Sequence, residues 1–323
     1  MAEMSFRNAL RLTLQEELRA DENVFLMGED IGAYGGSYSV TKGLFEEFGP
    51  DRIMDTPISE SVIVGAGIGA AMAGLRPIVE IMTINFSLLA LDQIVNNAAK
   101  LSYMSAGQIN VPMVIRMASG AGSQLSSQHS QSLEGWYAHI PGIKVVVPYS
   151  PRDARGLLKT AFNEQNPVIF IEHTALYARK GEVPDEDYSI PFGQAEVMRE
   201  GADVTLIGYS GSVYQTLAAA DILDEAGRQA DVINLRTLRP LDVDTILASV
   251  RKTHRAVLIE DDWKFGGFAG EISAIIMEEA FDDLDAPVAR VCGADVPIPY
   301  AKALEQAALP NPQQIADAAL ALF

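Results

Sequence analysis

The chain has 323 residues and a formal net charge of −19, with 48% hydrophobic and 21% charged residues. This composition is typical of an ordinary globular protein, and the length allows two domains that each bury a full core. The negative charge argues against nucleic acid as a partner, because its phosphates would be repelled, and suits a basic protein partner instead. Cys292 is the only cysteine, which excludes an intramolecular disulfide.

The first thirty residues predict an amphipathic helix followed by a strand. Apolar residues recur at helical spacing at Phe6, Leu10, Leu14 and Leu18. The segment lacks the apolar core of a signal peptide, and its acidic residues argue against a transit peptide. We therefore expect a cytoplasmic protein of bacterial type that does not contact a membrane. A location in the mitochondrial matrix would require the chain to be a processed form.

Short apolar runs alternate with amphipathic stretches along the rest of the chain. This alternation predicts an α/β fold with two doubly wound, mainly parallel sheets, each covered by helices on both faces. A charged segment that contains proline, residues 178–195, interrupts the alternation, and we interpret it as a linker. The predicted domains are residues 1–185, which overlap the start of this linker, and residues 196–323.

Residues 55–86 form the most informative stretch, DTPISESVIVGAGIGAAMAGLRPIVEIMTINF. Pro57 disfavours helical angles in the residue before it, so the helix must begin later. Ser59 and Ser61 are candidate N-caps, which places Glu60 in the first turn. The glycine-rich interior has a low helix propensity, so we expect this helix to be buried against another backbone, at a subunit contact. Spacing alone favours Glu60 as an acid that interacts with the helix dipole.

Two other interpretations of this helix fit poorly. Its apolar part, 62–75, is shorter than the roughly 18 residues expected of a membrane span. The run GAGIGA satisfies the G-x-G-x-x-A dinucleotide fingerprint, but its glycines lie inside the helix instead of in a turn between strand and helix. It also lacks an acidic residue about 20 positions further on, because Glu80 comes too early.

The chain contains the runs DTPISE, GAAMAGLRPIVEIMTINF, DQIVNNAAK, SSQHSQS, LRTLRPLD and DAPVARVCGADVPIPYA. Together these runs resemble the beta subunits of the thiamin-diphosphate-dependent 2-oxo acid dehydrogenases, with the pyruvate dehydrogenases as the closest variant. The resemblance extends over nearly the whole chain. It implies a pyrimidine-binding domain followed by a domain like the transketolase C-terminal domain. It also implies oxidative decarboxylation of pyruvate with transfer of the acetyl group to a lipoyl group.

The resemblance also implies roles for individual residues. Glu60 would share a proton with a pyrimidine ring nitrogen of thiamin diphosphate. Phe86 and Met82 would lie against the same cofactor, and Glu29 would be its neighbour. His129 would face the substrate or the lipoyl group as a proton donor or an orienting group. The residues alone leave simpler alternatives open: a core position for Phe86, a helix cap or solvated acid at Glu29, and a solvent-exposed loop histidine.

The family binds magnesium with a Gly-Asp-Gly sequence followed by Asn-Asn, and this chain has no Gly-Asp dipeptide. The resemblance therefore implies an alpha subunit that holds the diphosphate and magnesium in an α2β2 heterotetramer. It implies a dihydrolipoyl acyltransferase as a further partner. It also implies a structural potassium ion, held mainly by backbone carbonyl groups. The matching positions are Met113, Ala161, Phe162, Glu164 and Asn166.

Three alternative functions stay open. Branched-chain 2-oxo acid dehydrogenase and acetoin dehydrogenase belong to the same enzyme class, and the partner subunit would largely recognise the substrate side chain. A non-catalytic scaffold subunit belongs to a different class, and the presence of both Glu60 and His129 counts against it.

Acidic residues cluster at 278–285, with no basic residue before Arg290. A solvated helix end is the simpler interpretation. The need of the family to dock on an acyltransferase core favours a docking role instead.

Overall fold

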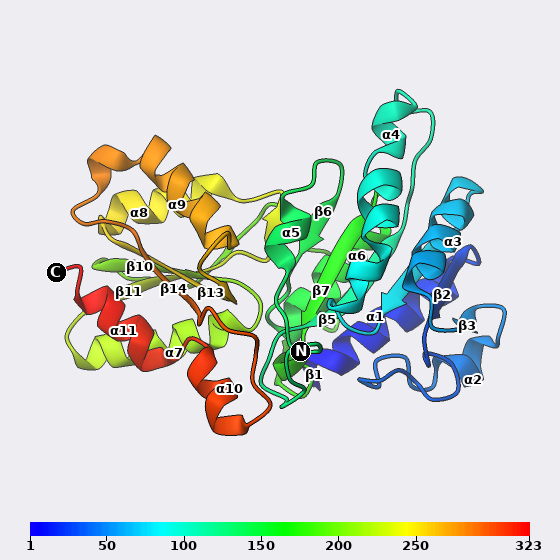
Figure 1. Cartoon of the computed structure of the whole chain (residues 1–323), viewed down its shortest axis with the longest axis horizontal. Coiled ribbons are helices and arrows are strands. Elements are labelled where there is room, and N and C mark those ends of the chain that lie inside the picture. The colour runs from blue at the N-terminus through cyan, green and yellow to red at the C-terminus, as the bar shows by residue number, and fades with distance from the viewer. The chain divides into compact units, whose positions relative to one another are not determined.

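The computed structural model describes all residues, 1–323, and they form two compact units (Figure 1). Unit 1 comprises residues 1–119 and 136–192, and unit 2 comprises residues 120–135 and 193–323. Each unit has its own sheet and core, which confirms the predicted α/β class with two mainly parallel sheets. None of the helices combines the length and the apolar sequence that a membrane-spanning segment requires.

The sheet of unit 1 has the strand order β6-β7-β5-β4-β2-β3, and neighbouring strands run parallel. Its strands are β2 (Val24–Gly28), β3 (Ile53–Asp55), β4 (Arg76–Ile81), β5 (Val114–Ser119), β6 (Lys144–Val146) and β7 (Val168–His173). Every residue of β5 and β7 is buried, which explains their nearly continuous apolar sequences, because parallel sheets are covered on both faces.

Helices cover both faces of this sheet. Helices α1 (Phe6–Ala20) and α6 (Pro151–Phe162) pack together on one face, in a core that includes Leu26 and Ile78. Helix α3 (Glu60–Met72) packs on the opposite face, where a Cβ on Gly67 would come within 2.7 Å of Val79. This close approach explains one glycine of the predicted small-residue helix. The helix is buried on one side only, since Val62 is 65% exposed.

The segment predicted as a linker belongs to unit 1. Strand β8 (Lys180–Val183) pairs antiparallel with β1 (Ala2–Ser5), and Ile190 is buried in the core of the same unit. Residues 178–192 therefore lie within unit 1, and the chain of unit 2 resumes at Gly193. Charged, half-exposed strands of four residues have little apolar alternation, so their pairing has no clear signal in the sequence.

The helical segment from Phe86 to Met104 is irregular. A 3-10 helix (η1, Phe86–Ala90) is followed by a π-helical segment (η2, Gln93–Ala98), and the α-helix α4 covers only Leu101–Met104. Polar side chains bond to one another within the segment: Asn96 Nδ2 donates to Asp92 Oδ1 at 2.7 Å. Asp and Asn compete with regular helical hydrogen bonding, and π-helical turns are frequent at functional sites.

Unit 2 has the strand order β14-β13-β10-β11-β9, in which only β9 runs antiparallel to its neighbour. Its strands are β9 (Glu196–Arg199), β10 (Val204–Gly208), β11 (Ala230–Asn234), β13 (Ala256–Trp263) and β14 (Ala289–Gly293). Helices α7 (Ser212–Glu225) and α11 (Pro312–Leu320) pack together on one face of the sheet. Helices α8 (Val243–Thr253) and α9 (Phe268–Glu279) cover the other face (Figure 1).

The remaining elements are short. They are α2 (Leu44–Phe48), α5 (Glu134–Ala138), β12 (Thr237–Arg239), α10 (Lys302–Ala308) and the 3-10 turns η3 (Thr174–Leu176) and η4 (Phe281–Asp283).

Candidate functional site

Three neighbouring strands of unit 1 end at one edge of its sheet. Gly28, the last residue of β2, is paired with the end of β3 on one side and with β4 on the other. The chain that leaves these strands carries Glu29 after β2, Glu60 after β3 and Met82 after β4. Open parallel sheets bind ligands at the carboxyl ends of their strands, so this edge is the candidate site in unit 1.

Two carboxylates form the polar part of this edge. Glu60 is the first residue of α3 and is 4% exposed, and Glu29 is 8% exposed. The backbone N–H of Ser59 donates to the Glu29 carboxylate, while Glu29 Oε1 is buried without a hydrogen-bond partner. Burial, and then the negative charges of Glu60 and Asp30, raise the pKa of Glu29. Glu29 therefore has a carboxylate oxygen without a hydrogen-bond donor, and its carboxyl group takes up a proton more readily than usual.

Local hydrogen bonds fix the two chain segments that carry these carboxylates. Thr56 N–H donates to the carbonyl of Gly28 at 2.9 Å, and Gly32 N–H donates to Asp55 Oδ1 at 2.6 Å. A Cβ on Gly32 would lie 2.5 Å from the Asp55 carboxylate, so this close approach requires glycine. The turn after β2 is thereby tied to the end of β3.

Met82 and Phe86 form the apolar part of the region. Both side chains are half-buried. Phe86 begins η1, which packs against α3, the helix that starts at Glu60. Ser87, in the same turn, is hydrogen-bonded to the Tyr137 hydroxyl and so fixes η1 to the body of the unit. Unit 1 thus gathers four of the predicted residues, Glu29, Glu60, Met82 and Phe86, around the ends of β2, β3 and β4.

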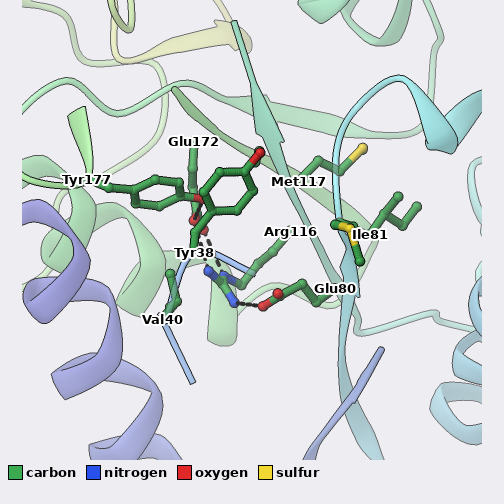
Figure 2. Close-up of a pocket in the computed structure, with 10 residues that line it drawn as sticks. Tyr38, Val40, Glu80, Ile81, Arg116, Met117, Glu172 and Tyr177 are labelled. Atoms are coloured by element: carbon green, nitrogen blue, oxygen red, sulfur yellow. Dashed lines mark hydrogen bonds and ion pairs between the residues drawn. The ribbon is translucent and has the colours of Figure 1, made fainter. Parts of the chain in front are cut away.

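Met82 also lines a small cavity. A buried ion-pair network lies in this cavity (Figure 2). Arg116 on β5 is at the centre of this network. Its Nε and Nη2 donate to the two oxygens of Glu172 at 2.7 and 2.8 Å, and its Nη1 donates to Glu80 at 2.7 Å. One guanidinium therefore ties together the carboxyl ends of β4, β5 and β7.

Two tyrosines pack against this network. The Tyr177 hydroxyl donates to Glu172 Oε2 at 2.8 Å, and the Tyr38 ring stacks on Tyr177 with centroids 5.1 Å apart (Figure 2). Burial lowers the pKa of Arg116, but the charges of Glu172 and Glu80 outweigh it and raise that pKa. Arg116 therefore stays charged. Sequence analysis missed this group, although a lone arginine within the apolar run VIRMA was a signal for it.

His129 belongs to unit 2, unlike the four residues above. It is exposed, and it belongs to the segment 120–135 that forms part of unit 2. Its backbone N–H donates to the carbonyl of Ser126 at 3.2 Å. His129 is therefore not part of the residue group that unit 1 holds together by itself.

The predicted potassium ligands surround the end of α6, but two basic side chains already bond to them. The Arg76 guanidinium donates to the carbonyl of Phe162, and Lys144 pairs with the Glu164 carboxylate. In favour of a cation, Asn166 Oδ1 is buried without a hydrogen-bond partner. Residues Ala161 and Phe162 also line a small cavity beside Arg76. The donor set fits potassium only if Arg76 turns away from Phe162.

The acidic cluster at 278–285 is partly neutralised in the folded chain. Arg251 Nε donates to Asp283 at 3.3 Å, and Arg255 Nη2 lies 3.0 Å from Asp285. The sequence showed no base within the cluster, because these arginines come from α8 and from the residues before β13.

Comparisons with known proteins define the class first. Two family models match the chain: the transketolase pyrimidine binding domain over residues 2–180, and the transketolase C-terminal domain over residues 193–315. A solved structure described as a split gene transketolase, inactive beta4 tetramer, has a TM-score of 0.81 at 21% identity. The match covers 99% of this chain and 98% of that one. The fold is therefore that of the transketolase class.

Curated relatives then define the family. The pyruvate dehydrogenase E1 component subunit beta-2, mitochondrial, of Oryza sativa is 52% identical over 98% of this chain and 85% of its own length. The corresponding beta subunit of Rickettsia felis is 49% identical over 98% of this chain and 97% of its own length. The chain belongs to the family of pyruvate dehydrogenase E1 component beta subunits, which confirms the resemblance seen in its sequence.

Proposed function

We propose that the chain, together with an alpha subunit, removes CO2 from pyruvate and transfers the acetyl group to a lipoyl disulfide of a dihydrolipoyl acyltransferase. The disulfide is reduced in this step, so one sulfur carries the acetyl group and the other becomes a thiol. The observation that carries the proposal is the buried pair of Glu60 and Glu29, with an open acceptor oxygen, at the carboxyl edge of a parallel sheet. The roughly 50% identity to named beta subunits supports it.

The residues of unit 1 fit one half of thiamin diphosphate. When bound, this cofactor supplies the carbon that adds to the 2-oxo group and accepts the electron pair left by CO2. Glu60 would hold a proton on a pyrimidine ring nitrogen, as a general acid–base. Glu29, whose pKa is raised by burial and by Glu60, would lie beside Glu60 at the edge of that ring. Phe86 and Met82 would contact the ring and exclude water from it.

His129 would serve the second half of the reaction. In the proposal its imidazole orients the lipoyl group or donates a proton to the departing sulfur. Its exposure and its place in a loop suit contact with a group that another protein delivers.

The partner subunit completes the cofactor site in this proposal. An alpha subunit would bind the diphosphate and magnesium, in an α2β2 heterotetramer, because the chain has no Gly-Asp dipeptide. Potassium would bind at Asn166 after displacement of Arg76. KCl, but not NaCl, should then raise the melting temperature of the assembled protein. The similarity to a bacterial beta subunit supports a cytoplasmic location in this proposal.

Steady-state rates of the reconstituted alpha–beta pair test the proposal. Pyruvate should be oxidised faster than 2-oxoisovalerate or acetoin, and the product should be acetylated lipoyl domain. A preference for 2-oxoisovalerate or acetoin would reassign the substrate within the same class. Failure to support turnover with any of them would favour the scaffold alternative.

A further inference from the structure

The segment that carries His129 is tied to α10 of unit 2 by one buried carboxylate. Glu305 is 1% exposed, and its Oε1 accepts hydrogen bonds from the backbone N–H groups of Gly122 at 2.9 Å and Gln124 at 3.0 Å. Oε2 also lies 3.2 Å from the Gln124 nitrogen. Hydrogen bonds from backbone N–H groups to an ionised carboxylate are stronger than those between neutral groups.

The backbone of this segment needs such support. Gly122, Gln124 and Ser126 all have positive φ angles, of 105°, 56° and 69°. A left-handed conformation is unfavourable for a non-glycine residue, so it persists only where surrounding contacts hold it. Glu305 bonds directly to two of these three residues, five and seven positions before His129.

On both sides of the histidine, its segment lies close to the rest of unit 2. On the Gly122 side, Ala121 packs with Ile298 and Ala308 in a small apolar cluster. On the other side, a Cβ on Gly135 would lie 3.8 Å from Asp262 Oδ2 at the end of β13. Open α/β sheets usually bind ligands at the carboxyl ends of their strands, and here the chain's own segment lies beside that edge.

We propose that Glu305 is a positioning residue for His129. It fixes the 122–126 turn and thereby the direction in which the histidine is presented. This inference rests on the proposed role of His129 in lipoyl acetylation. It also gives unit 2 a part in the reaction, since unit 2 then orients a catalytic loop.

Glu305→Ala and Glu305→Gln test the proposal in the assembled holoenzyme, with Gln306→Ala as the control because Gln306 is its exposed neighbour on α10. Amide hydrogen exchange at Gly122 and Gln124 should accelerate at least tenfold in Glu305→Ala and remain unchanged in Gln306→Ala. Lipoyl acetylation should fall by about tenfold relative to dye-linked decarboxylation, because misplaced groups lose rate steeply. Glu305→Gln keeps a carbonyl acceptor, so its amide exchange rates and its rate of lipoyl acetylation should be intermediate. If Glu305→Ala does not assemble with the partner subunit, Glu305→Gln provides the test in its place.

A double-mutant cycle separates positioning from general destabilisation. In a His129→Ala background, Glu305→Ala should cause no further loss of acetylation, because both changes remove the same interaction. A full additional loss, or unchanged amide exchange, would overturn the proposal. Failure of the proposed function has a different signature, since His129→Ala alone would then leave lipoyl acetylation unchanged.

Discussion

The carboxylate of Glu29 lies beside that of Glu60, and the backbone N–H of Ser59, the residue before Glu60, donates to it. The turn after β2 is therefore hydrogen-bonded to Ser59, the N-cap of α3, while the carboxylates of Glu29 and Glu60 repel each other. Because Glu60 raises the pKa of Glu29, a change at Glu60 alters the protonation of Glu29.

Replacing Glu29 with glutamine should lower turnover by roughly tenfold to a hundredfold, because Glu29 acts on the cofactor ring mainly through Glu60. The loss should be smaller than that caused by a change at Glu60 itself. Steady-state rates of the assembled enzyme measure it, with the exposed Glu46→Gln as control. A rate equal to that of wild type would remove Glu29 from the site.

The isolated chain should not bind thiamin diphosphate in a magnesium-dependent manner, because the alpha subunit is proposed to hold the diphosphate. Titration calorimetry of the chain alone, and then of the chain mixed with an alpha subunit, measures this. Binding should appear only in the mixture. Tight binding by the chain alone would reveal a diphosphate site within it.

His129→Ala should damage reductive acetylation of a lipoyl domain more than decarboxylation assayed with an artificial oxidant. The expected difference is on the order of tenfold or more, the contribution of a positioned acid–base or orienting group. Both assays use the same enzyme preparation, which controls for assembly. An equal loss in both would assign His129 to substrate binding or to the first step.

Asp262 should make the stability of the protein depend on pH. Burial, and the charges of Glu134, Glu260 and Asp261, raise the pKa of Asp262 to about 8, from an ordinary value of 3.8. A carboxyl group whose pKa is raised by folding stabilises the folded state at low pH, and this contribution is lost as the pH rises from about 4 through 8. Asp262→Asn should therefore exceed the melting temperature of wild type by several degrees more at pH 9 than at pH 5. A difference between the two proteins that does not vary with pH would contradict this.

Much of the fold could be predicted from the sequence, where local signals agree with packing. The apolar face of α1, the buried strands and the start of α3 at Glu60 all follow from periodicity, proline and capping rules. Helix α6 begins at a capping box formed by Ser150 and Asp153, which the sequence SPRD contains. These elements depend on contacts between near neighbours along the chain.

What the sequence did not reveal depends on distant residues. Glu305, within KALEQAA, has the sequence context of an exposed helix residue, yet it is buried because its partners come about 180 positions earlier. The pairing of Arg251 with Asp283 and that of β1 with β8 are likewise set by tertiary structure. No local propensity encodes such contacts, so a sequence pattern identifies Glu60 more readily than the residues that support it.

The turnover of Glu60→Gln, measured with pyruvate in the assembled enzyme, tests the central claim most directly. Glutamine keeps the size of the side chain but cannot share a proton as a carboxyl group does. Assembly with the alpha subunit should be preserved, while the rate should fall by roughly 10²–10⁴, the usual contribution of a general acid–base. A rate within a few-fold of wild type would contradict the assignment of Glu60 to the cofactor.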